Sequence, residues 1–84
     1  MIGLLSQYKV GHYYKRRLYR RSWIYGYKKY ILIFKVEAIV RNGIHVKVIY
    51  SNSAYYTNKQ HIFLYTIGWE DEEIEESEAI FELI

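Results

Sequence analysis

An alternation of apolar and mixed residues over Tyr27–Val40 is the feature that most limits how this chain can fold. From Tyr30 onward the even-numbered positions are all apolar, while the odd-numbered positions mix lysine, glutamate and isoleucine. Successive side chains of a strand point to opposite faces, so this segment predicts a strand with one core face and one wetter face. The same alternation returns over Ile44–Tyr50. The two segments therefore predict an antiparallel pair.

The segment Arg41-Asn42-Gly43 separates the two predicted strands and sets their register. A three-residue loop pairs Val40 with Ile44 and keeps both apolar sets on one face, whereas a two-residue loop opposes an apolar face to a wet one. The three-residue loop needs a left-handed residue in its last position, which favours glycine. We therefore expect a type I turn with a bulge at Gly43, and Glu37 opposite Lys47 on the outer face.

The remaining segments are read from weaker patterns. Residues 8–14 alternate well enough to open a sheet, and residues 61–67 read as a strand after the polar loop 51–60. Residues 16–25 fit either an extended basic loop or one arm of a long ribbon with the following strand. From Glu70 the apolar spacing becomes helical, with acidic residues in the first turn, where they suit the helix dipole. A helix is the favoured reading of this tail, and a final strand over residues 79–84 is the alternative.

Composition narrows the class of protein. The 84 residues include no cysteine, so a disulfide framework and a thiolate metal site are excluded. No apolar run approaches the roughly 18–20 residues of a membrane span, and the first residues lack the basic region of a signal peptide. We expect a soluble, cytoplasmic protein (in the host cytoplasm if the chain is viral). We expect residues 1–84 to form a single domain: a β-barrel over 1–68 with a basic insert near 15–29, and an acidic, helical C-terminal segment over 69–84.

Charge is divided along the chain. Residues 1–60 carry all 12 Lys and Arg residues and one acid, Glu37, for a net charge of +11, while residues 61–84 carry eight acids and no Lys or Arg. Between Lys9 and Lys29 there are eight cationic residues and no acidic one, interleaved with tyrosines and a tryptophan. Guanidinium groups pair with phosphate oxygens and aromatic faces accept stacked bases. This stretch therefore predicts a nucleic-acid or nucleoprotein interface made by Lys15, Arg16, Arg17, Tyr19, Arg20, Arg21, Trp23, Tyr25, Lys28 and Lys29, with Tyr13 as a further stacking residue.

The acidic tail offers an alternative site. A dense carboxylate array imitates phosphate spacing, so a protein inhibitor could use it against a nucleic-acid enzyme. Its residues are Glu70, Asp71, Glu72, Glu73, Glu75, Glu76 and Glu78. The two charged regions also fit each other, either within one molecule or between two copies, which would give a homo-oligomer.

Catalytic and metal chemistry find little support in the sequence. The three histidines, His12, His45 and His61, lack the spacing of a ligand pair, and no phosphate loop or nucleophile elbow is present. We expect a non-enzymatic binding module without metal or cofactor.

The rhythm of four or five short strands, the Asn-Gly hairpin and the opening Val10-Gly11-His12-Tyr13-Tyr14 resemble the small SH3-like barrels of phage and bacterial proteins. The resemblance implies a mainly β fold, an SH3-like (or OB-like) barrel of four to five antiparallel strands with an acidic C-terminal helix. It also implies that the basic insert takes the place of a long binding loop. Small size and opposed charges further resemble phage-encoded inhibitors of host enzymes or defence systems, which bind protein directly.

One detail of the central strands points to an additional covering element. The wetter face carries Ile31, Ile33, Ile39 and Ile49, which is more apolar than a solvated sheet needs. We expect the tail or a partner to cover it.

Overall fold

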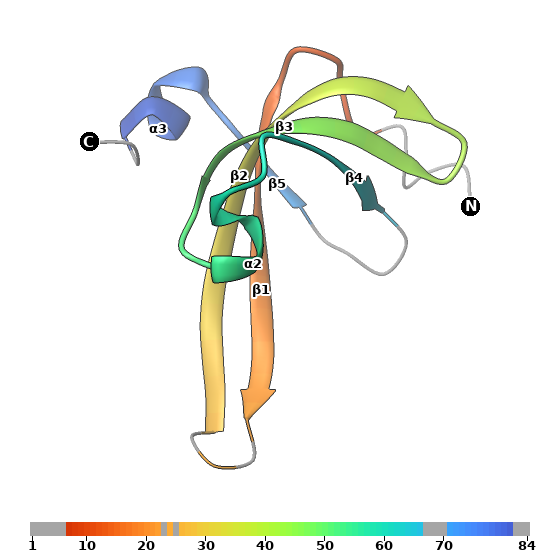
Figure 1. Cartoon of the computed structure of the whole chain (residues 1–84). Helices are drawn as coiled ribbons and strands as arrows, with labels where there is room; N and C mark the ends of the chain where they lie inside the picture. The colour runs from red at the N-terminus through yellow and green to blue at the C-terminus, as the bar shows by residue number, and fades with distance from the viewer. Residues whose placement is uncertain (1–6, 23, 25, 67–70, 82–84) are drawn as a thin grey trace.

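The computed structural model of the chain describes residues 7–22, 24, 26–66 and 71–81, except for the side chains of residues 20–22 and 27. It is mainly β, as expected, with one antiparallel sheet in the order β4-β3-β2-β1-β5 (Figure 1). The strands are β1 (Tyr13–Ser22), β2 (Gly26–Val40), β3 (Gly43–Ser51), β4 (His61–Tyr65) and β5 (Asp71–Ile74). Two short helices, α2 (Ala54–Thr57) and α3 (Glu76–Phe81), complete the described elements.

The two longest strands, β1 and β2, form a hairpin that starts the sheet. Their register runs from Tyr13 opposite Lys35 to Ser22 opposite Gly26. The ribbon reading of residues 16–25 is therefore confirmed for the described positions. The expected opening strand over residues 8–14 is wrong for most of its length, because β1 begins only at Tyr13. Ahead of it, the backbone turns through Gly11, whose φ of 87° a side chain would disfavour.

The main core lies on the face that the alternation assigned to it. Leu32, Phe34 and Val36 of β2 are fully buried, and the facing residues Ile44 and Val46 of β3 are buried with them. The same cluster contains Tyr8, Tyr14 and Leu64, so the segment before β1 and the edge strand β4 both close over β2. Burying apolar surface in this way is the main stabilising term of so small a domain.

The turn between β2 and β3 differs from the expected one. Val40 pairs with Gly43, so the loop has two residues, and Gly43 does not have a positive φ. The conflict between faces is resolved elsewhere, by a register shift between Val36 and Ala38 that sets Val36 opposite Val46. A bulge adds one residue to one strand and thereby returns the apolar side chains to a common face.

The predicted Glu37–Lys47 pair is wrong for the same reason. Lys47 lies opposite Lys35, and the Glu37 carboxylate instead lies within hydrogen-bond distance of His61 Nδ1, at 2.7 Å. Gly43 is needed for a different purpose than the expected turn. A Cβ atom there would lie 2.4 Å from the carbonyl oxygen of Leu64, so the glycine allows β4 to approach β3.

The acidic tail, one of the two covers expected for the second face of the sheet, lies over part of that face, and Ile39 stays 38% exposed. Ile74 and Ala79 are buried against Ile33, with Ile31 and Ile49 packed beside them. The tail is only partly helical, however. Asp71–Ile74 forms strand β5 against β1, and the helix α3 starts at Glu76. The edge of β1 supplies backbone partners and cations to residues that would otherwise begin a helix.

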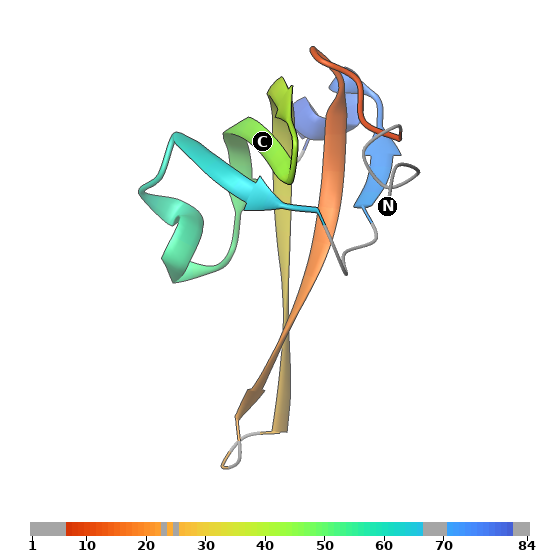
Figure 2. The same ribbon diagram turned by 90° about the vertical axis from the view of Figure 1, so that its right-hand side faces the viewer.

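The sheet is open, and one side chain bridges its two edges. Strands β4 and β5 are at opposite ends of the strand order, yet Figure 2 shows β4 returning across the sheet toward β1. Arg16 of β1 donates to the carbonyl oxygen of Tyr65, at the end of β4, and to Asp71, at the start of β5. None of the described helices is long and apolar enough to span a membrane.

Candidate nucleic-acid interface

The β1–β2 hairpin continues beyond the rest of the sheet as a projecting ribbon, defined here as Leu18–Ser22 with Gly26–Tyr30. Strand β5 pairs with β1 only as far as Arg16, and β3 pairs with β2 only from Leu32 onward. The ribbon therefore extends from the body as two strands without a third in the described chain (Figure 1).

Polar side chains mark the point where the ribbon leaves the sheet. The amide of Ile31 donates to Asn52 Oδ1 at 2.9 Å, and Ser51 Oγ donates to the carbonyl of Ile31 at 2.7 Å. These bonds satisfy the edge of β2 where β3 turns away. They mark where β2 leaves the sheet, while Leu18, the first ribbon residue of β1, still packs against the main core.

The ribbon concentrates cations and aromatics. Arg20 lies opposite Lys28 and Tyr19 lies opposite Lys29 in the register. Tyr19 is 61% exposed, and Lys28 and Lys29 are exposed as well. No acidic residue lies in either arm. The predicted residues Trp23 and Tyr25 lie outside the described residues, and for Arg20 and Arg21 only the backbone is described.

Arg16, a predicted phosphate contact, is a buried structural residue. It is 2% exposed, and its Nε and Nη2 atoms donate to the two carboxylate oxygens of Asp71, each at 2.7 Å. Nη2 also donates to the carbonyl of Tyr65 at 3.1 Å. A two-pronged guanidinium–carboxylate pair of this kind satisfies both ions and fixes their geometry. We call this group, with the Tyr8 hydroxyl that also donates to Asp71, the Arg16 clasp.

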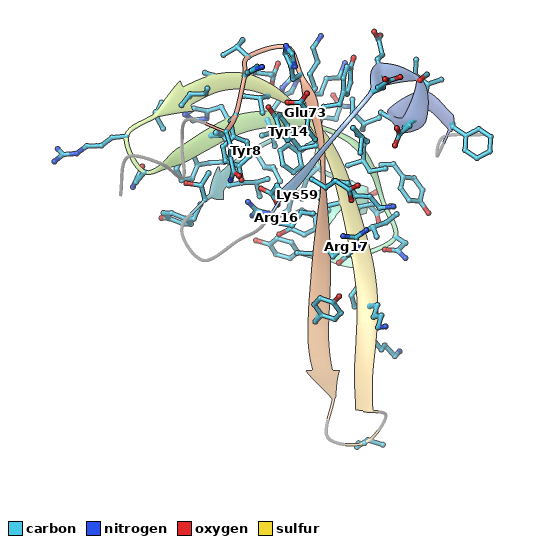
Figure 3. All side chains as sticks on the ribbon, turned by 180° about the vertical axis from the view of Figure 1, so that it is seen from behind. Tyr8, Tyr14, Arg16, Arg17, Lys59 and Glu73 are labelled. Atoms are coloured by element: carbon cyan, nitrogen blue, oxygen red, sulfur yellow. The ribbon has the colours of Figure 1, made fainter. Side chains whose placement is uncertain are left out.

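Tyr8 and Tyr14 lie beside Arg16 and are buried with it (Figure 3). Burial, together with the hydrogen bond to Asp71, raises the pKa of Tyr8 far above its ordinary value. Burial likewise raises the pKa of Tyr14, whose hydroxyl lies 3.2 Å from Glu73 Oε1. Ionising either hydroxyl would place a second negative charge beside a carboxylate in a poorly solvated site.

Where the ribbon leaves the sheet, the cations of β1 are paired with acidic residues of the tail. Arg17 Nη2 lies 3.2 Å from Glu72 Oε2, with both side chains largely exposed, and Lys15 lies opposite Glu72 in the register. Tyr13 packs among the residues of the second face, and Lys35 Nζ lies over its ring. These predicted residues therefore stabilise the sheet and its acidic strand β5, and the remaining predicted cations lie farther along the hairpin.

The acidic alternative is divided in the same way. Asp71 is buried in the clasp, Glu72 faces Arg17, and Glu73 is bonded to Tyr14 and lies 3.6 Å from His12 Nδ1. Glu75, Glu76 and Glu78 are exposed, and Glu70 lies outside the described residues. The expectation that the two charged regions meet within one molecule is confirmed for these pairs.

A group of exposed aromatics beside β4 was not predicted as a site. Tyr55 of α2 and Tyr65 of β4 are 66% and 62% exposed, and Lys59 Nζ lies 3.7 Å from the centre of the Tyr55 ring. The Tyr-Tyr pair within the polar loop 51–60 was the available signal, because exposed loops seldom need two adjacent aromatics. Among the described residues, no three acidic or histidine side chains are placed to hold a metal ion.

Comparison with family models, with curated proteins and with solved structures finds no match to this chain.

Proposed function

We propose that this protein is a non-enzymatic module that binds nucleic acid through the projecting ribbon. Arg20, Arg21, Lys28 and Lys29 contact phosphates, and Tyr19 contributes an aromatic surface. Trp23 and Tyr25, which lie between the two arms in the sequence, stay in the proposed set of contact residues. The observation that carries the proposal is the position of these residues, which lie beyond Arg16, the last residue of β1 that pairs with the described strand β5, on a ribbon without a third strand among the described residues.

The energetics of the ribbon support a role in binding. A two-stranded ribbon alone is at best marginally stable in water, because it buries little apolar surface. Cations opposite one another, such as Arg20 and Lys28, disfavour strand pairing further. An anionic partner would offset both costs. Two-stranded ribbons also have the dimensions to enter a major groove, and basic aromatic surfaces hold single strands.

The SH3-like barrel expected from the sequence is compatible with this proposal. We propose that the sheet is an SH3-like barrel left open between β4 and β5, with the Arg16 clasp in the opening. The projecting ribbon then takes the place of the long binding loop that was expected near residues 15–29. On this proposal the protein acts in the cytoplasm, where nucleic acid is accessible.

Salt-dependent binding tests the proposal. We would titrate fluorescently labelled single-stranded and duplex oligonucleotides with the protein and follow anisotropy at several salt concentrations. Four neutralised phosphates on a single strand give a slope of about −3 for log K against log [salt]. The double variant Arg20→Ala/Arg21→Ala should reduce that slope in magnitude by about 1.4.

The matched control is Arg41→Ala/Lys47→Ala, which removes the same charge from two exposed positions away from the ribbon. It should bind nearly as tightly as the parent protein. The proposal is overturned if neither oligonucleotide binds at low salt, the outcome expected of a phage-type inhibitor that recognises only protein. It is also overturned if the control loses as much affinity as the ribbon variant.

A further inference from the structure

A cavity of about 480 Å³ lies in the opening of the sheet, between the outer edge of β4, the helix α2 and Arg16 of β1. Figure 2 shows α2 and β4 on the same side of the β1–β2 hairpin. Arg16 lies two residues before the projecting ribbon, so the cavity opens near the root of the proposed interface.

Within the described chain, one residue of β4 presents both an unoccupied main-chain donor and an unoccupied main-chain acceptor to this cavity. In an antiparallel pair only every second residue turns its N–H and C=O toward the neighbouring strand. The bond from Val48 N to the carbonyl of Gln60 fixes this phase, so Phe63 and Tyr65 turn theirs outward. The bond between Arg16 and the Tyr65 carbonyl agrees with this phase. Phe63 therefore keeps an outward N–H and C=O without a partner among the described residues.

The walls beside Phe63 are aromatic and carry one cation. Tyr55 and Tyr65 line the cavity with most of their surface exposed, and Tyr56 meets the Tyr55 ring edge-on with centres 4.8 Å apart. Lys59 lines the same cavity and lies over Tyr55. Flat aromatic surfaces, a paired donor and acceptor, and an ammonium group match a base, its hydrogen-bonding edge and a phosphate.

The length of the available edge argues against an added peptide strand. Arg16 occupies the carbonyl at Tyr65, so Phe63 is the one described residue along the part of β4 that lines the cavity to keep both an outward N–H and an outward C=O. Strand addition needs a row of such groups. A single flat heterocyclic ring needs only one N–H and one C=O group.

We propose that this cavity binds one unpaired nucleobase, stacked on Tyr55 and Tyr65 and hydrogen-bonded to the main chain of Phe63, with its phosphate at Lys59. The inference rests on the proposed function and deepens it: the preferred ligand is a single strand, whose phosphates follow the ribbon while one base enters the cavity. A duplex would have to release a base to use the same site.

The first experiment needs no oligonucleotide. We would titrate the isotopically labelled full-length protein with adenosine and uridine monophosphates and record ¹H–¹⁵N spectra, with ribose 5-phosphate as the base-free probe. The amide of Phe63 should shift with a nucleotide and stay in place with ribose 5-phosphate. Equal shifts with all three probes would mean a phosphate site only, and no shift with any of them would mean no base site. Either result overturns the inference.

The second experiment separates this inference from the proposed function. Tyr55→Ala should weaken single-strand binding by about 5- to 150-fold and leave duplex binding and the salt slope unchanged. Tyr55→Phe keeps the stacking surface and should retain the affinity. The inference fails if single-strand and duplex binding fall equally, or if Tyr55→Phe binds as poorly as Tyr55→Ala. If Arg20→Ala/Arg21→Ala leaves single-strand binding unchanged while Tyr55→Ala weakens it, the ribbon proposal alone is overturned.

Discussion

Replacing Asp71 with asparagine should lower the free energy of unfolding of the protein by a large amount. The Arg16 and Asp71 side chains are 3% and 0% exposed, and the carboxylate accepts from both guanidinium nitrogens and from the Tyr8 hydroxyl. An asparagine amide has one acceptor oxygen and turns a donor toward these donors. Breaking a buried pair by removing one partner costs roughly 3–5 kcal/mol, because the other charge stays buried without compensation.

The neighbouring residue supplies a matched control. Glu72 belongs to the same strand and faces a cation of the same partner strand, but both side chains of its pair with Arg17 are largely exposed. Exposed pairs contribute about 0.2–1 kcal/mol, so Glu72→Gln should have little effect. Both variants remove one negative charge from β5, so the difference between them isolates burial.

Urea unfolding followed by tryptophan and tyrosine fluorescence, with circular dichroism as a second probe, measures both free energies of unfolding. For a domain of this size, a loss of 3 kcal/mol corresponds to a fall in Tm of about 12 °C or more. If Asp71→Asn and Glu72→Gln lower the free energy of unfolding equally, the clasp is not the structural centre described above. Coincident transitions by the two probes are required, because the comparison assumes two-state unfolding.

Three further outcomes follow from particular contacts. The raised pKa of Tyr8 means that the folded state retains a proton that the unfolded state loses near its ordinary value of 10.0. The stability that this proton contributes is therefore fully present below pH 10 and is lost as pH rises above it. Tyr8→Phe should flatten this fall in the free energy of unfolding, measured by urea titration at several pH values. An unchanged slope would contradict the burial of the hydroxyl. Gly43→Ala forces a Cβ against the Leu64 carbonyl, so thermal melting should show a loss of about 1–3 kcal/mol, whereas a neutral result would mean that β4 does not approach β3 so closely. Ile74→Ala should cost about 2–5 kcal/mol because it opens the packing on the second face, while Ile80→Ala, at a half-exposed position, should cost far less; similar losses would refute the tail's role as a cover.

The central hairpin illustrates both the strength and the limit of sequence reasoning. Alternation identified β2 and β3 and the buried set around Phe34, because side-chain period is a local property of a strand. It did not identify the loop, since a bulge between Val36 and Ala38 restores the common face just as well as a longer turn. The close approach of β4 to Gly43 also lies outside the local pattern, because it joins segments that are distant in the sequence.

The candidate site shows the same division. The run of cations over residues 15–29 is plain in the sequence, and so is its separation from the acidic tail. The sequence does not show which of those cations pair within the protein, because Arg16 and Arg17 form ion pairs with residues 55 positions away along the chain. The cavity was missed because its walls come from β1, α2 and β4, and no spacing relates them.

The sequence by itself determined a mainly β chain without cysteine, two adjoining strands with a shared core face, and opposed charges in its two regions. Only the tertiary structure decided that Asp71–Ile74 is a strand, that Arg16 is structural, and that the ribbon projects beyond the sheet. The physical reason is that periodicity and composition act between near neighbours. Pairing of an edge strand and burial of an ion pair depend on which distant segment arrives beside it.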